Sequence, residues 1–431
     1  MENLINFLSA HLDSRKANFL LNSLKTNQDY FFQKFILDNI NHITTWLNSD
    51  DFKQYENNTY PPLVNPKTID IEPSDYCAEL AWKLNIPLEN AKFIYISPHG
   101  VGAAAFLTLL NEACNVYCPA SWVLPNNGYC RYNLNFKSLL QYSQTAINIS
   151  ETNILDLDKY LNLIDCNIPI LIQTRDPISL LKHSYGRDWS KVQRNYNQNF
   201  NLNFNYQEYI NFLKPNKTYM KDDFENLLEN TFIMHTLLNK INANNITYID
   251  MCDLDEKKAY DTFINLANKF DFTPPPHNDE NLFKRKEFRG YIRYLLPLIF
   301  QVDYEIKLII NRYHINNEQI NIFSYISNND LKNNIGIYID KNKISKFLNH
   351  KNYAKIKQYL SNFLDAIKDI VDYTETNLMK EDEVLDYLKK NKTARLKLKD
   401  ILDKELIHIK NFRPDIVKSW KYYQEFEKFF S

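Results

Sequence analysis

The chain has 431 residues, enough for one large or two moderate domains. Hydrophobic residues account for 44% of it and charged residues for 24%, a balance that excludes a wholly disordered chain and a small fold dependent on disulfides. The 51 Lys and Arg residues against 52 Asp and Glu residues give a net charge of -1, which excludes the strong basic bias of a dedicated nucleic-acid-binding protein.

The N-terminal part of the chain, up to about residue 50, is expected to form amphipathic helices. Leu4, Leu8 and Leu12 recur there at helical spacing. A polar stretch then leads to residues 60–63, which read Tyr-Pro-Pro-Leu. Because proline interrupts helices and favours extended backbone, this stretch is expected to be a linker.

A parallel β-sheet is predicted next, because short apolar runs alternate with helical stretches of crossover length. The predicted strands are residues 93–96, 115–118, 146–149, 169–172 and 246–249. The expected fold class is therefore α/β, with a parallel sheet of about five strands flanked by helices. In open sheets of this class, ligands bind beyond the carboxyl ends of the strands, so the residues that follow each strand are the functional candidates.

The remainder is expected to be mostly helical, with residues 335–339 as a lone strand. These patterns divide the chain into a helical N-terminal extension and linker over residues 1–66, an α/β core over 67–299 and a mainly helical C-terminal region over 300–431.

Two of only 6 glycines follow the first predicted strand. Residues 97–103 read Ser-Pro-His-Gly-Val-Gly-Ala and lead into an Ala-rich helix. A loop of this kind, with a helix N-terminus behind it, can cradle an anion such as phosphate with its backbone amides. The alternative is that Gly100 and Gly102 only allow a tight turn. The loop lacks the Gly-Lys-Ser/Thr of an ATP-binding Walker motif.

A second candidate segment follows the fourth predicted strand, where the chain reads Arg175-Asp176-Pro177. Asp176 is a natural helix N-cap and Pro177 a natural first helical residue, which leaves Arg175 at the carboxyl edge of the sheet. His183 and Ser184 lie two turns further along that helix. Arg175 could instead pair with a neighbouring carboxylate.

A third candidate segment is residues 283–290, which hold four cations and one of the few glycines. Such a stretch can form a local anion site in an otherwise neutral chain. A solvated basic stretch is the alternative interpretation.

In this order, the three segments resemble the sulfotransferase family. That family binds the 5′ phosphosulfate of phosphoadenosine phosphosulfate with a Pro-Lys-Ser/Thr-Gly-Ser/Thr-Thr loop after its first strand, the place that residues 97–103 occupy here. Its Arg-Asp-Pro strand end and a following serine hold the ribose phosphate, and a late Arg-Lys-Gly segment caps it. The resemblance implies a P-loop-type α/β fold and a donor site formed by Pro98, His99, Gly100, Val101, Gly102, Ala103, Arg175, His183, Ser184, Arg285 and Lys286.

The resemblance covers about residues 90–295 and has departures. His99 stands in place of the family's lysine, Ala103 and Ala104 replace hydroxyl residues, and His183 displaces the serine by one position. A histidine is a weaker and pH-dependent cation, so a different phosphorylated donor, or loss of activity, stays open. The chain also resembles a group of bacterial proteins encoded near surface-glycan genes.

The resemblance implies a transferase that moves a sulfuryl group from a nucleotide donor to a hydroxyl of a surface glycan. His99 is the candidate loop cation and Glu151, after the third predicted strand, the candidate base, with Asp250 as its rival. Two alternatives are transfer of a substituted phosphoryl group from another nucleotide, such as a cytidine nucleotide, and a non-catalytic protein that binds a glycan or a protein.

No metal and no nucleic acid are expected among the ligands. Cys114 and Cys118 lack a second Cys or His pair at zinc-site spacing and are expected to be buried thiols. The chain begins without a basic segment followed by an apolar core, and no apolar stretch reaches the roughly 18 residues that span a bilayer. We therefore expect a cytoplasmic protein, for which peripheral membrane association and the oligomeric state stay open.

Overall fold

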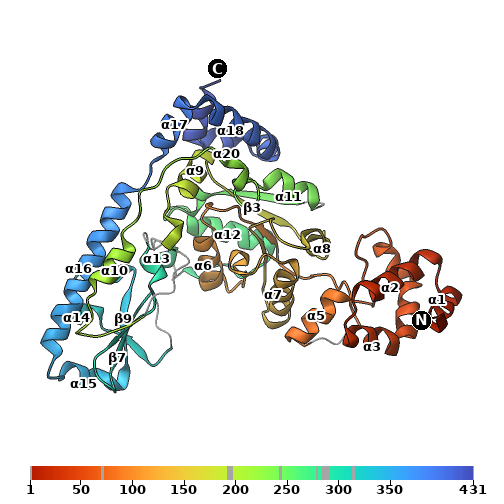
Figure 1. Ribbon diagram of the computed structural model, residues 1–431, viewed down its shortest axis with the longest axis horizontal. Coiled ribbons are helices and arrows are strands. Elements are labelled where there is room, and N and C mark those ends of the chain that lie inside the picture. The colour runs from red at the N-terminus through yellow and green to blue at the C-terminus, as the bar shows by residue number, and fades with distance from the viewer. Residues whose placement is uncertain are drawn as a thin grey trace. The chain divides into compact units, whose positions relative to one another are not determined.

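A computed structural model describes residues 2–68, 72–191, 198–241, 245–277, 280–283, 291–312 and 316–430 (Figure 1). The chain divides into two compact units, each built from separate segments. Unit 1 comprises Met1–Asp176, Asp223–Phe283 and Arg395–Lys421, and unit 2 comprises Pro177–Asp222, Lys284–Ala394 and Tyr422–Ser431. The predicted boundaries at residues 66 and 299 therefore differ from the boundaries of these units, which are discontinuous in sequence.

The N-terminal part of unit 1 is helical, as its leucine spacing predicted. Its helices are α1 (Glu2–His11), α2 (Ser14–Thr26), α3 (Tyr30–Asp38), α4 (Ile40–Leu47) and α5 (Asp75–Lys83). The carboxylates of Asp13 and Asp29 and the hydroxyl of Ser74 accept hydrogen bonds from the first amides of α2, α3 and α5. These side chains supply acceptors that the first turn of a helix lacks, and so they set where each helix begins.

Unit 1 contains a parallel sheet of four strands in the order β2-β1-β3-β5. The strands are β1 (Ile94–Ile96), β2 (Ile147–Ile149), β3 (Ile170–Thr174) and β5 (Ile246–Asp250). The chain runs from β1 outward to β2 and then returns to β3 on the other side of β1. The order of strands therefore reverses between β1 and β3, which is where ligands bind in sheets of this kind.

The predicted strand over residues 115–118 is wrong. Only an isolated parallel bridge forms there, between Tyr117 and Thr145. Asn115 ends the preceding helix in the left-handed conformation, with φ of 52°, and Pro119 has no amide to donate. These two residues limit the pairing of the segment to that single bridge.

Helices cover both faces of the parallel sheet. α6 and α12 pack on the face that presents Phe93, Tyr95 and Leu171, and α7 and α8 lie on the other side of the strands (Figure 1). Because alternate strand residues point to opposite faces, this explains why every residue of β1, β2 and β3 is buried. The remaining helices of unit 1 are α6 (Ala103–Cys114), α7 (Gly128–Gln141), α8 (Leu157–Asn162), α11 (Met234–Lys240), α12 (Ala259–Phe270), α13 (Glu280–Phe283), α18 (Lys392–Glu405, from Arg395 onward), α19 (Ile407–Phe412) and α20 (Pro414–Ser419).

Unit 2 contains a second sheet, which corrects the expectation of a lone strand after residue 300. Its five strands have the order β4-β6-β7-β9-β8, with β4 parallel to β6 and the other pairs antiparallel. The predicted strand at residues 335–339 corresponds to β9. The strands are β4 (Asn199–Phe200), β6 (Leu298–Gln301), β7 (Lys307–Asn311), β8 (Gln319–Asn321) and β9 (Gly336–Asp340). β4 and β8, with two and three residues, carry too few residues for a period to be recognised in the sequence.

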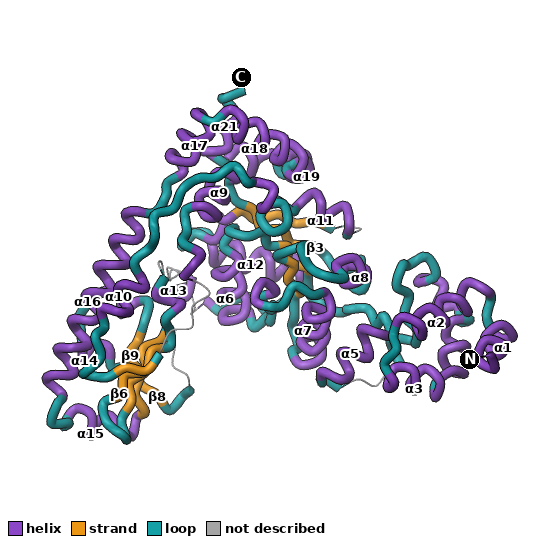
Figure 2. The backbone as a smooth tube through the Cα atoms, in the orientation of Figure 1, coloured by secondary structure: helices purple, strands orange, loops and turns teal. Residues whose placement is uncertain are grey.

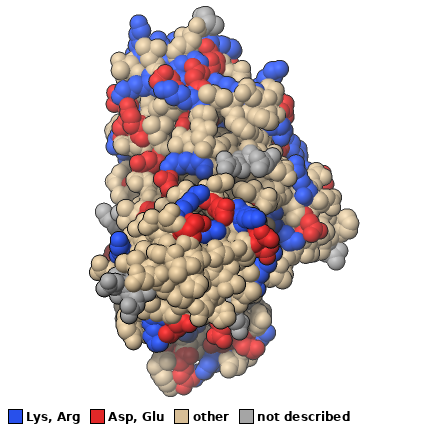
Figure 3. Space-filling view, turned by 90° about the vertical axis from the view of Figure 1, so that its right-hand side faces the viewer, with Lys and Arg blue, Asp and Glu red and all other residues tan. Residues whose placement is uncertain are grey.

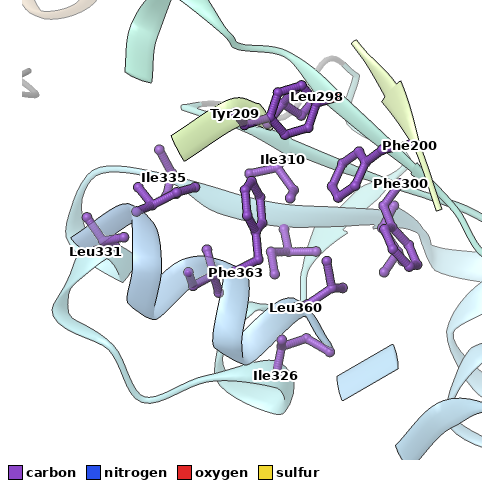
Figure 4. Close-up of a cluster of buried hydrophobic side chains, with 14 of the residues drawn as sticks. Phe200, Tyr209, Leu298, Phe300, Ile310, Ile326, Leu331, Ile335, Leu360 and Phe363 are labelled. Atoms are coloured by element: carbon purple, nitrogen blue, oxygen red, sulfur yellow. The ribbon is translucent and has the colours of Figure 1, made fainter. Parts of the chain in front are cut away.

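Helix α16 packs across this sheet and forms the core of unit 2 (Figures 2 and 4). Phe363 of α16 is fully buried against Phe200 and Tyr209, with ring centroids 5.5 and 6.0 Å away. The helices of unit 2 are α9 (Pro177–Tyr185), α10 (Gln207–Leu213), α14 (Phe323–Ile326), α15 (Ile344–Leu348), α16 (Tyr353–Asn377), α17 (Glu381–Lys390) and α21 (Lys421–Glu427, from Tyr422 onward). Across the described residues, no helix combines the length and the apolar character needed to span a membrane.

Candidate functional site

The candidate site lies at the carboxyl edge of the unit 1 sheet. Since the four strands are parallel, the residues that follow β1, β2, β3 and β5 all meet at this edge. Ser97, Ser150, Arg175 and Met251 are the first residues beyond these strands. The loop of residues 97–102 and Arg175 therefore flank the point between β1 and β3 where the strand order reverses.

Two glycines shape the loop after β1. Gly100 and Gly102 have φ of 92° and 93°, a left-handed conformation that costs other residues energy. Gly102 is also the N-cap of α6, and it has no side chain to bond the first helical amides. The amides of Gly102, Ala103 and Ala104 have no acceptor among the described residues. These amides and the positive end of the 12-residue helix α6 can attract an anion.

Strand β3 holds this loop through two backbone carbonyls. Arg175 Nη1 donates to Gly100 O at 2.8 Å, and Gln173 Nε2 donates to Val101 O at 2.6 Å. Gln173 is fully buried, and its own carbonyl accepts a hydrogen bond from the Tyr95 hydroxyl. The structure thus brings two of the sequence-predicted segments, residues 97–103 and Arg175, into direct contact.

These two hydrogen bonds also orient the loop amides. In a trans peptide the C=O and N–H groups point in opposite directions. Because the Val101 carbonyl is bound by Gln173, the amide of Gly102 points away from β3. The Gly100 carbonyl is bound by Arg175, and the amide of Val101 correspondingly points back to Pro98 O at 3.3 Å.

Residues Glu229 and Asn230 cross the same edge of the sheet. His99 N donates to Asn230 O at 2.7 Å, and Thr152 N donates to Glu229 O at 2.8 Å. This segment therefore links the loop after β1 to the loop after β2. His99 itself is partly exposed, whereas Pro98 and Val101 are buried.

A buried polar network joins the same two loops inside the protein. Asn148 of β2 donates to Ser97 Oγ at 2.7 Å and accepts hydrogen bonds from the amide and hydroxyl of Ser121. Ser121 Oγ lies 2.8 Å from Ser150 Oγ. All four side chains are buried, so each hydroxyl and amide depends on these partners. The network fixes Ser150, and therefore the start of the loop that carries Glu151.

Glu151 faces Arg131, a guanidinium of α7 that is only 1% exposed. Glu151 Oε2 lies 3.6 Å from Arg131 Nη2, and no described residue hydrogen-bonds to Nε, Nη1 or Nη2 of Arg131. Burial raises the pKa of Glu151 above its ordinary value, and the positive charge of Arg131 opposes this rise. Burial likewise lowers the pKa of Arg131. A carboxylate with a raised pKa is a stronger base, which suits Glu151 for accepting a proton.

Asp250, the rival base, is engaged in structural contacts. Its carboxylate accepts hydrogen bonds from Trp420 Nε1 at 2.8 Å, Thr174 Oγ1 at 3.1 Å and the amide of Cys252 at 3.1 Å. It thereby caps the short helix after β5 and anchors the C-terminal segment of unit 1. These contacts occupy the oxygens that a catalytic base would need.

The other sequence-predicted site residues fall into three groups. His183 and Ser184 lie on α9 of unit 2, where His183 packs edge-on against Trp189 and Ser184 Oγ is buried without a hydrogen-bond partner among the described residues. Arg285 and Lys286 lie outside the described residues. Ala103 is the first residue of α6 and is partly exposed.

Three side chains of this edge carried no signal in the sequence analysis. Gln173, Asn148 and Arg131 are polar residues inside apolar runs or on a helix, and their partners are distant in the sequence. A polar residue within a buried strand is the one available hint, because such a residue needs a partner.

Basic and acidic residues are nearly equal in number in this chain, 51 against 52. On the face drawn in Figure 3, basic and acidic side chains are interspersed. An anionic ligand must therefore be recognised by local groups rather than by a field of one sign. Within the part of the chain that the structure describes, no group of three His, Cys, Asp or Glu side chains could hold a metal ion. Cys114 and Cys118 are buried, and burial raises the pKa of Cys114 to about 12.

Residues 248–430 match a family model described as a protein of unknown function (DUF2972). The match begins within β5, so Glu151, Arg175 and the loop of residues 97–103 precede it. No curated protein and no solved structure matches the chain.

Proposed function

We propose that this chain is a transferase that moves a sulfuryl group from phosphoadenosine phosphosulfate to a hydroxyl of a bacterial surface glycan. The observation that carries the proposal is the contact between Arg175 and the glycine loop, 2.8 Å from Nη1 to Gly100 O, where the strand order reverses. It assembles a cation and a helix N-terminus at one point from segments 75 residues apart in the sequence. Both groups favour bound phosphate.

In the proposed reaction, the acceptor hydroxyl oxygen forms a bond to sulfur. The bond between sulfur and the 5′ phosphate oxygen breaks, and its electron pair leaves with the phosphate. The amides at the start of α6 stabilise the charge that develops on this phosphate, and Glu151 accepts the hydroxyl proton. The main contribution of the protein is to position the two reactants and to stabilise the leaving group.

A second candidate is transfer from another nucleotide, such as a cytidine nucleotide. The observation in its favour is the composition of the loop. His99 replaces a lysine of the sulfotransferases, and Ala103 and Ala104 offer no hydroxyl groups to a phosphosulfate. A cradle that relies on amides alone accepts any phosphorylated donor whose remaining parts fit.

Calorimetry with 3′-phosphoadenosine 5′-phosphate tests the proposal. The wild type should bind it, and Arg175→Ala should bind it at least about tenfold more weakly, because a charge-assisted hydrogen bond is lost. Arg413→Ala is the matched control, since Arg413 also donates to a backbone carbonyl of unit 1, that of Tyr248 at 3.2 Å, but does so beside β5. It should leave the affinity unchanged.

Three outcomes separate the alternatives. No binding by the wild type would rule out the sulfotransferase assignment. Stabilisation by cytidine nucleotides instead, in a thermal unfolding assay, would support the second candidate. A protein that binds no nucleotide, and whose cellular role survives Arg175→Ala, would be a non-catalytic binding protein.

A further inference from the structure

A lysine-rich segment lies on unit 2, in a chain whose net charge is only -1. Residues 341–357 contain six lysines and His350, and no Asp or Glu. The segment includes α15 and the first turn of α16. Five of the six lysines are exposed and Lys343 is partly exposed. Four of these lysines form no ion pair with any described residue, so their charges face solvent: Lys343, Lys351, Lys355 and Lys357.

The turn between β6 and β7 lies against this segment. Lys346 pairs with Glu305, and His350 Nε2 lies 3.4 Å from the carboxylate of Asp303. Tyr304 lies between Asp303 and Glu305 in the chain, and its side chain is 90% exposed. Asp303 Oδ1 accepts hydrogen bonds from the amides of Glu305 and Ile306, both at 2.8 Å, so the turn is rigid and holds Tyr304 outward.

Part of the lysine-rich segment forms one surface with the turn. Ser345, Lys346, Asn349, His350 and Lys351 line a hollow of about 500 Å³, and two of these residues are those that contact the β6–β7 turn. Figures 1 and 2 show α15 at the end of the sheet where this turn lies. Residues 301–307 and 340–357 together contain seven lysines and three carboxylates, which gives these segments a net charge of +4.

We propose that this surface, defined by Tyr304 and the lysines of residues 341–357, docks the protein on an anionic phospholipid membrane. Lysines near such a surface are attracted to the lipid phosphates, and tyrosine is favoured at the level of the headgroups. The cations of the surface are lysines rather than arginines, whereas nucleic-acid recognition favours the flat, bidentate guanidinium. The proposal goes beyond the transferase activity and does not depend on it.

Co-sedimentation of the full chain with lipid vesicles tests the proposal. Vesicles that contain phosphatidylglycerol should bind the protein, vesicles of phosphatidylcholine should not, and added salt should weaken binding. Each lysine near an anionic surface contributes about fivefold to partitioning, so Lys343→Gln with Lys351→Gln should weaken it about 25-fold. Tyr304→Ala should cause a further loss that salt does not change.

The control is a second pair of substitutions, Lys25→Gln with Lys269→Gln, which removes the same charge from exposed positions of unit 1. It should leave vesicle binding within about twofold of the wild type, because both lysines lie outside the proposed surface. Equal losses in the two pairs, or equal binding to both kinds of vesicle, would overturn the proposal. Tighter binding to a DNA duplex than to anionic vesicles would overturn it as well and identify a nucleic-acid surface.

Discussion

The sheets of the two units differ in where they place polar side chains. In unit 1 the strands are all parallel, and buried polar residues gather where they end: Ser97, Asn148, Ser150, Gln173, Thr174 and Asp250. In unit 2 the strands are mostly antiparallel, and the sheet packs with α16 around a core of aromatic and aliphatic side chains. The sheet of unit 1 thus gathers polar side chains, which are costly to bury, at the edge of the candidate site, whereas the core around the sheet of unit 2 is apolar.

The physical reason lies in the direction of the strands. Parallel strands bring every carboxyl end to one edge, so loops from distant parts of the chain meet there and can form a site. An antiparallel sheet alternates its loops between two edges and disperses them. The predictions below test this difference, starting with the largest expected effect.

Phe363→Ala should destabilise unit 2 by about 3–5 kcal/mol, because it removes a fully buried ring from the aromatic core. Hydrogen exchange measured by segment should show faster exchange in β6, β7 and β9 and unchanged exchange in β1 and β3. Tyr373→Ala, on the same helix but 47% exposed, is the control and should change stability by no more than about 0.5 kcal/mol. Equal acceleration in both sheets would show that the two units unfold as one.

Joint replacement of Arg131→Met and Glu151→Gln should leave unit 1 as stable as the wild type or more stable, by up to about 4 kcal/mol, because two partly desolvated charges are removed. The same variant should lose group transfer, since the proposed base is gone. Denaturant unfolding and the transfer assay measure the two effects.

A more exposed ion pair, between Lys137 of α7 and Asp75 of α5, provides the comparison for that variant. Lys137 and Asp75 are 2.5 Å apart, with Asp75 78% exposed. Lys137→Met with Asp75→Asn should cost no more than about 1 kcal/mol and leave transfer intact. Strong destabilisation of the Arg131 and Glu151 variant would mean that this pair stabilises the fold rather than serving the site.

Gly102→Ala should cost about 1–2 kcal/mol, because φ of 93° is unfavourable for a residue with a Cβ atom. The new Cβ would also lie 3.4 Å from Gln173 Nε2, which binds the loop through Val101 O. Nucleotide binding, followed by calorimetry, should weaken. Ala103→Gly, one position later, adds no atom and should leave binding largely intact; equal losses in the two variants would argue against a shaped loop.

The smallest effect concerns pH. Burial raises the pKa of Glu151 above its ordinary value of 4.5. The protonated Glu151 therefore contributes fully to the free energy of unfolding below pH 4.5, and this contribution is lost as the pH rises through the raised pKa. The wild type should therefore lose stability relative to Glu151→Gln as the pH increases, as measured by unfolding temperatures from about pH 4 to about pH 8. With Arg131→Met the loss should be larger, because the opposing positive charge is removed. A constant difference between wild type and Glu151→Gln would exclude a raised pKa.

Much of unit 1 could be predicted from local patterns. The apolar runs located β1, β2, β3 and β5, and the scarcity of glycine drew attention to Gly100 and Gly102, whose φ angles are indeed positive. In unit 2 only β9 was predicted; β4 and β8, with only two and three residues, are among the strands that escaped prediction. A strand that short is stabilised by its neighbours in the sheet and not by its own sequence.

The sequence by itself determined where the turns fall and which residues follow each strand, because helix caps, prolines and glycines act on their immediate neighbours. Only the tertiary structure decided which distant residues meet: Gln173 with Val101, Asn148 with Ser97 and Ser121, and Arg131 with Glu151. These pairings depend on strand order and register, which result from packing of the whole unit and leave no trace in the spacing of residues along the chain.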